Sequence, residues 1–66
     1  MSVAKVIEIS AQSPEGFEDA IREGISKAKQ TVHNMSGAWI KEQSVALKDG
    51  EITAYRVDLK VTFLLD

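Results

Sequence analysis

The hydrophobic and polar positions of this chain change their period along its length, and each change marks the boundary of a predicted element. Residues 4–10 alternate as in a strand, with Ile7 and Ile9 on one side and Glu8 and Ser10 on the other. Further along, apolar residues recur every three or four positions, which is typical of a helix with one apolar face. This stripe consists of Phe17, Ala20, Ile21, Gly24, Ile25, Ala28 and Val32.

The helix is predicted to run over residues 14–32 or 33. Ser13 can cap its start, Pro14 suits the first helical position, and Glu15 lies near the positive end of the helix dipole. Gly24 lies within the apolar stripe, where it costs about 1 kcal/mol of helix propensity relative to alanine. We interpret this glycine as the point where the helix approaches a sheet closely.

After a predicted break at residues 34–37, two strands flank the dipeptide Asp49-Gly50, which is a strong hairpin signal. If these two residues form the turn, this register pairs Ile40 with Leu59, Ala38 with Val61, Trp39 with Lys60 and Lys41 with Asp58. Apolar residues then meet on one face, and opposite charges meet on the other. The last strand alternates most clearly, with Tyr55, Val57, Leu59, Val61, Phe63 and Leu65 on one side.

The element order is therefore strand, helix, strand, strand, in one α+β domain over residues 1–66. Because the first connection contains a helix, strands one and two are predicted to be parallel, with strand three between them and antiparallel to both. The helix covers one face of this three-stranded sheet. The helix-free face is predicted to carry Val6, Trp39, Val45, Leu47 and Ile52 among the charged residues Glu8, Lys41, Arg56, Asp58 and Lys60.

A chain of 66 residues is below the length at which one core reliably supplies more than about 3–5 kcal/mol of stability. It contains no cysteine for a disulfide, and a single histidine makes a structural zinc site unfavourable. Oligomerisation remains as the means of stabilisation. We therefore expect the helix-free face to pack against other copies of the chain.

The sequence also argues against several classes of function. The net charge is −2 and the basic residues are scattered, whereas nucleic-acid binders cluster them. No apolar run approaches the ~20 residues of a membrane span, and the start lacks the apolar stretch of a signal peptide, so a cytoplasmic location is expected. No nucleophile motif, phosphate-binding glycine loop or calcium loop is present, and His33 suits a helix end. We expect neither an enzyme nor a metal site.

Two side chains of the helix-free face suggest binding. Trp39, the only tryptophan, can pack at a subunit interface or stack on a flat ligand, and the two interpretations weigh equally. Arg56 can form an interface salt bridge or pair with a ring, phosphate or carboxylate. Asp58, Lys60 and Lys41 suit a ladder of salt bridges between subunits better than an anion site.

The whole chain resembles the dodecin family. The similarity is carried by the start at residues 5–9, the segment Ser13-Pro14-Glu15, the helix end at residues 28–34, and the segments 55–57 and 63–66. The resemblance implies a strand-helix-strand-strand protomer whose sheet curls around its helix, and twelve protomers that form a hollow sphere. It also implies binding of flavins, riboflavin or FMN, which typical members stack between tryptophans of neighbouring subunits and store rather than use in turnover.

The chain departs from the typical dodecin pattern at both principal flavin contacts. Gly37 occupies the position of the flavin-stacking tryptophan, and Trp39 follows two residues later, displaced by ~6–7 Å along the same strand face. Arg56 replaces the glutamine that follows the tyrosine of the third strand. The chain thus resembles a branch without that tryptophan, for which ion binding has been proposed, and coenzyme A binding is associated with the wider family.

From this resemblance we expect a small-molecule-binding and sequestering protein, with flavin as the family's default ligand. Its candidate binding residues are Trp39, Arg56, Gly37 and Lys41. The alternative is a structural dodecamer without flavin, which binds ions or another phosphorylated ligand such as coenzyme A.

Overall fold

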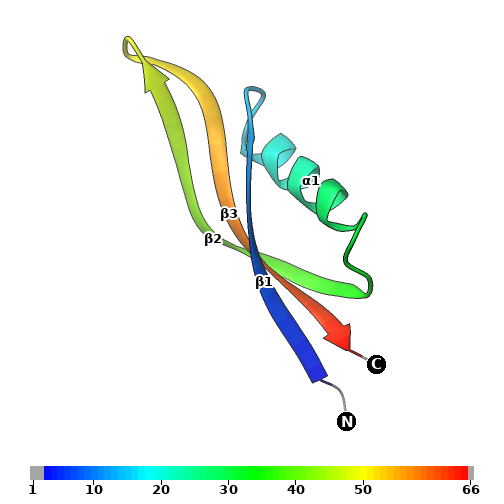
Figure 1. The fold of residues 1–66 in the computed structure, drawn as a ribbon. Coiled ribbons are helices and arrows are strands. Elements are labelled where there is room, and N and C mark those ends of the chain that lie inside the picture. Colours follow the sequence, from blue (N-terminus) through cyan, green and yellow to red (C-terminus); the bar gives the residue numbers. More distant parts are fainter. Residues whose placement is uncertain (1–2, 66) are drawn as a thin grey trace.

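A computed structural model describes residues 3–65, in which three strands form one sheet and a single helix lies against it (Figure 1). The elements are β1 (Val3–Ser13), α1 (Phe17–Ala28), β2 (Met35–Lys48) and β3 (Glu51–Leu65). The sheet order is β1-β3-β2, and β3 is antiparallel to both neighbours. The predicted α+β fold, strand order and central position of the last strand are confirmed.

The helix covers only part of the sheet. Its 12 residues span roughly 18 Å, whereas the 15 residues of β3 extend over roughly 50 Å. The helix packs mainly over β1 and β3, and the hairpin of β2 and β3 curves away beyond it (Figure 1). Ile40 of β2 therefore remains 45% exposed although it faces Leu59 of the core.

The core lies between the middle of β3 and the helix. Val57, Leu59 and Val61 of β3 are at most 1% exposed, and Ala20 of the helix is fully buried. These residues are surrounded by half-buried Ile7, Ile9, Ala11, Phe17, Ile21, Ile25 and Met35. The helix approaches β1 at Gly24, where an added Cβ would lie 3.1 Å from Cβ of Ala11. The interpretation of Gly24 as a point of close approach is confirmed.

Both predicted ends of the helix were wrong. The helix begins at Phe17 after Gly16, and no side chain caps it. Ser13 is instead the last residue of β1: its hydroxyl accepts a hydrogen bond from the amide of Glu15 (2.9 Å) and donates one to Asp19 (2.5 Å). The serine thus stabilises a turn before the helix.

The helix ends at Ala28, four residues before the last position of the apolar stripe. The amides of Gln30 and Thr31 bond to carbonyls three residues back, at 3.2 and 3.1 Å, so the chain tightens into a turn. Asn34 has a positive φ of 62°, and β2 begins directly after it at Met35, within the predicted break. The chain therefore reaches the sheet sooner than the apolar pattern indicates.

The predicted hairpin turn is confirmed. Asp49 and Gly50 have φ angles of 52° and 78°, as the type I′ turn requires. The pairs of Ile40 with Leu59, Ala38 with Val61 and Trp39 with Lys60 also form as predicted.

The pair of Lys41 with Asp58 was wrong, because Lys41 lies in a β-bulge and Glu42 faces Asp58. A bulge shifts the alternation of the residues that follow it until a second irregularity restores the register. Val45 consequently faces Tyr55, whose ring packs edge-on against Phe17 of the helix at 5.1 Å. The prediction that Val45 lies on the helix-free face was therefore also wrong.

Candidate ligand-binding face

Trp39 is a large, half-exposed ring on the sheet face opposite the helix. It lies in β2 across from Lys60 of β3, and 49% of it is exposed. The Lys60 ammonium is 6.0 Å from the ring centroid, at the outer limit of a cation–π interaction. One side of the indole is thus near a cation, and much of its surface is available to a partner or ligand.

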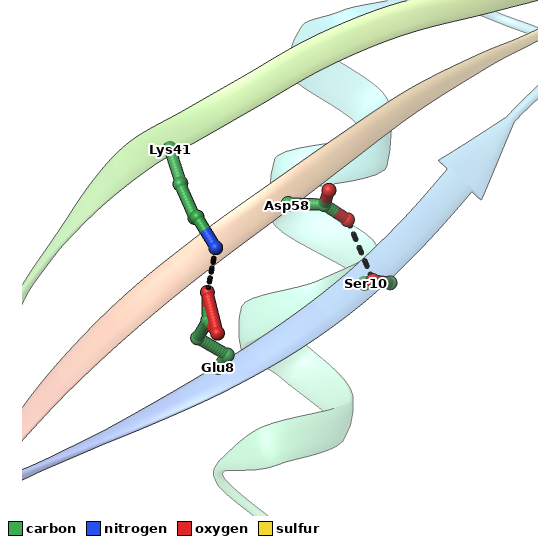
Figure 2. A network of polar contacts seen from close by, with 4 residues as sticks. All are labelled: Glu8, Ser10, Lys41 and Asp58. Carbon is green, nitrogen blue, oxygen red and sulfur yellow. Dashed lines mark hydrogen bonds and ion pairs between the residues drawn. The ribbon is translucent and has the colours of Figure 1, made fainter.

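The centre of the same face is occupied by two polar contacts (Figure 2). Lys41 Nζ reaches across β3 to Oε1 of Glu8 on β1, at 2.8 Å. Next to this ion pair, the Ser10 hydroxyl donates to Oδ1 of Asp58 at 2.6 Å. Figure 2 shows these side chains in front of the strands, with the helix behind. Because Lys41 already has a carboxylate partner, it is poorly placed to bind an anionic ligand.

The ion pair shifts the ionisation of both partners. The hydrogen bond and charge of Lys41 lower the pKa of Glu8 below its ordinary 4.5, and Glu8 raises the pKa of Lys41 above its ordinary 10.5. A lowered carboxyl pKa stabilises the fold above the unfolded value, and this stabilisation is lost as pH falls through the folded pKa. A raised ammonium pKa stabilises it below the unfolded value, and this is lost as pH rises through the folded pKa.

We predict that Lys41→Gln raises the pKa of Glu8 towards its ordinary value, because the substitution removes the charge and shortens the side chain that donates the hydrogen bond across β3. The side-chain carboxyl carbon of Glu8, followed by NMR during a pH titration, reports this change. Lys48→Gln is the matched control, since Lys48 lies at the hairpin turn opposite Glu51. An unchanged Glu8 titration in Lys41→Gln would contradict the assigned cause.

Arg56 lies at the other end of the face, beside a shallow hollow of about 360 Å³. Its Nε donates to Oε1 of Gln12 on β1 at 3.0 Å, and Ser44 of β2 faces it. The hollow is lined by Ser10, Ala11, Gln12, Glu42, Ser44, Arg56, Val57 and Asp58. One guanidinium and two carboxylates therefore meet there, together with hydroxyl and amide groups.

The four predicted binding residues share one face but do not form one site within the protomer. Arg56 lies four residues along β3 from Lys60, the partner of Trp39, which corresponds to about 13 Å. Gly37 lies beyond Trp39, opposite Thr62, and an added Cβ there would meet nothing within 4 Å. The Lys41 ion pair lies between the two ends.

Comparison with known proteins accounts for this architecture. The family model Dodecin matches residues 3–66. The chain belongs to the dodecin family. It is 36% identical to the calcium dodecin of Mycobacterium tuberculosis over 63 residues, which are 96% of this chain and 89% of that protein.

Solved dodecin structures have the same fold. The dodecin from Streptomyces davaonensis is 42% identical, with a TM-score of 0.93 over 98% of this chain and 96% of that one. The structure of the M. tuberculosis calcium dodecin, described as calcium chelating, gives 36% identity and a TM-score of 0.85 over 98% and 93% of the two chains. The predicted family membership is therefore confirmed.

Sequence reasoning missed several residues that line the hollow of this dodecin. Ser10 and Gln12 alternate with the apolar residues of β1, so the pattern of that strand contained the signal. Glu42 and Ser44 were not predicted as site residues, and the bulge at Lys41 places them opposite Asp58 and Arg56 on this face. Within residues 3–65, no group of three or more acidic or histidine side chains is arranged to hold a metal ion, and no helix is long and apolar enough to span a membrane.

Proposed function

We propose that this dodecin is a homo-oligomeric, cytoplasmic binding protein for a small molecule, with flavin as the first ligand to test, and that residues 1–66 act as one domain. The observation that carries this proposal is Trp39, a half-exposed indole on a sheet face that the helix does not cover. An exposed ring of this size gains free energy when another flat, apolar surface covers it. No catalytic role is proposed for any residue.

Exposed apolar side chains along the sheet support oligomerisation. Large apolar residues that are at least 38% exposed include Val3, Val6, Ile40, Val45, Leu47, Ile52, Leu64 and Leu65. Apolar surface of this extent is typical of chains that pack against other copies. We propose an assembly of twelve subunits, which light scattering of the purified protein would test. A stable folded monomer at micromolar concentration would contradict it.

We predict that titration with the protein quenches riboflavin or FMN fluorescence, and that Trp39→Ala weakens this binding by about tenfold, as expected for loss of an aromatic stacking partner. Trp39→Phe is the control, because it retains a flat ring of smaller area. Unquenched fluorescence at tens of micromolar wild-type protein would remove flavin as the ligand.

A gain-of-binding variant tests whether the absence of a ring at Gly37 weakens flavin binding. The space around Gly37 is open, so Gly37→Trp can restore the ring that typical dodecins carry there. We expect this variant to bind flavin more tightly than the wild type, whereas Gly37→Leu, which adds bulk without a ring, does not.

Calcium is the second candidate ligand, because a relative 36% identical over nearly the whole chain is a calcium dodecin. Residues 3–65 of one protomer contain no group of three or more acidic or histidine side chains arranged to hold a metal ion, so we propose that carboxylates of several subunits would meet at such an ion. Phosphorylated ligands such as coenzyme A are a further alternative, supported by the Arg56 guanidinium beside the hollow.

Elemental analysis and mass spectrometry of material released from the denatured native assembly would separate these candidates. Flavin would appear as a yellow compound, calcium would be found without an organic molecule, and coenzyme A would be identified by its mass.

A further inference from the structure

The hairpin of β2 and β3 contains a segment that is displaced by one residue from the register of its own turn. At the turn, Lys48 faces Glu51 and Leu47 faces Ile52; beyond the segment, Ile40 faces Leu59. These pairs all belong to one continuous register, in which each step forward along β2 is matched by one step backward along β3. Between them, residues 42–46 face residues 54–58, and each lies one position away from the partner that the continuous register would give it.

Two bulges of opposite effect produce this displacement. At the turn end of the segment, Thr53 of β3 has no facing residue on β2. At the other end, Lys41 of β2 has no facing residue on β3. The first bulge introduces the shift and the second removes it. The segment is thus bounded by two local irregularities, whereas residues 37–40 and 47–48 on either side pair as the turn dictates; a further irregularity lies between Met35 and Gly37 at the start of β2.

Three contacts favour the displaced register, and one opposes it. Lys41 is bonded to Glu8 at 2.8 Å, the Thr53 hydroxyl donates to the carbonyl of Ala46 at 3.3 Å, and Val45 lies opposite Tyr55. Against these, Glu42 lies directly opposite Asp58. Like charges at facing positions of two strands destabilise their pairing.

The continuous register removes that opposition. In it, Lys41 faces Asp58, so opposite charges meet, and Gln43 takes the place of Ser44 opposite Arg56. Both bulge residues gain a partner. The change requires no movement of β1 against β3, since these strands pair in an unbroken register from Val3 with Leu65 to Ser13 with Tyr55. β2 is an edge strand of the sheet in the described protomer, so its segment can move without breaking the pairs of β1 with β3, although Glu42 then replaces Gln43 opposite the buried Val57.

We propose that residues 42–46 of β2 exchange between these two registers on β3, so that the hairpin is a two-state element beside the binding face. In the displaced register, Glu42 and Ser44 lie on the face that carries Arg56 and Asp58. In the continuous register, Gln43 and Val45 replace them, and the face loses one negative charge. A ligand that interacts differently with the two faces shifts the exchange.

Disulfide trapping tests the exchange directly, because the chain contains no cysteine. The variant Ser44→Cys/Arg56→Cys forms an intrachain disulfide in the displaced register, and Gln43→Cys/Arg56→Cys forms one in the continuous register. Both are oxidised mildly in the native assembly, and denaturing mass analysis separates intrachain from interchain products. We expect both variants to form the intrachain bond, the first faster than the second.

Two substitutions outside the trapped positions should shift the ratio of the trapping rates. Asp58→Asn removes the like-charge opposition to Glu42 in the displaced register and the pair with Lys41 in the continuous one, so it is expected to slow trapping through Gln43→Cys by about 1.5- to 5-fold relative to trapping through Ser44→Cys. Thr53→Val removes the hydroxyl that donates to the Ala46 carbonyl in the displaced register. It should shift the ratio of trapping rates in the opposite direction. Glu51→Gln, at the turn, is the charge control and should leave it unchanged.

The proposal is overturned if Gln43→Cys/Arg56→Cys forms no intrachain disulfide under conditions in which the Ser44→Cys variant is fully oxidised. It is also overturned if Asp58→Asn leaves the ratio unchanged. Should Arg56→Cys prevent folding, the same comparison is made at Ala54, with Ala46→Cys for the displaced and Val45→Cys for the continuous register.

Discussion

Leu59→Ala is expected to unfold the protomer under conditions in which the wild type is folded. Leu59 is 1% exposed at the centre of β3 and belongs to the cluster that joins the helix to the sheet. Truncating a buried leucine to alanine costs about 2–5 kcal/mol, because transfer free energy is lost and a cavity remains. A chain this short draws only about 3–5 kcal/mol from its core. Circular dichroism during urea denaturation measures the loss.

Leu64→Ala is the matched control for this experiment, since it removes the same atoms from the same strand at a position that is 40% exposed. We expect it to shift the urea midpoint far less than Leu59→Ala. Equal losses in the two variants would show that burial between subunits, and not burial under the helix, determines the stability of β3.

The hairpin was predictable from sequence because two independent signals agree there. The turn residues Asp49 and Gly50 adopt positive φ angles readily, and the strands on either side carry matching apolar and charged patterns. The displaced segment was not predictable, because the alternation within it is intact. Only its register on β3 changes, and that register depends on the position of the bulge at Lys41.

The helix ends illustrate a different failure. Ser13, Pro14 and Glu15 have the composition of a helix start, but the Ser13 hydroxyl is already bonded to the amide of Glu15 and to Asp19 within a turn. At the other end, Val32 continues the apolar period because it is half-buried after the turn, not because it is helical. Periodicity reports burial, and burial continues past the end of the helix at Ala28, where the Val32 amide still bonds to the Ala28 carbonyl at 2.9 Å.

The sequence predicted which face of the sheet carries the candidate site, but not all the contacts among its residues. Strand alternation places Trp39 and Arg56 on the side away from the helix, and the structure agrees. The predicted pair of Trp39 with Lys60 already separates Trp39 from Arg56 by four residues of β3, or about 13 Å, so this distance did follow from the sequence. The ion pair of Lys41 with Glu8 joins β1 to β2 across β3, and no local pattern links residues so distant in the sequence.

Gly24→Leu is expected to be the most disruptive substitution on the helix. The hypothetical Cβ of residue 24 already lies 3.1 Å from Cβ of Ala11, with Ile9 Cδ1 at 3.5 Å and Leu59 Cδ1 at 3.6 Å. Cβ of Ala11 is fixed to the backbone of β1, so the larger side chain must separate helix and sheet. Overpacking of this kind typically costs about 1–3 kcal/mol, a large part of the stability of so small a chain.

Two companion variants isolate the cause of this loss. Ser26→Leu adds the same side chain to an exposed position of the helix and should leave the urea midpoint nearly unchanged. Gly24→Ala should lie close to the wild type, because about 1 kcal/mol of gained helix propensity offsets the tight contact with Ala11. If Gly24→Leu were as stable as Ser26→Leu, the helix would have room to move outward, and its close approach to β1 would not determine the packing of the protomer.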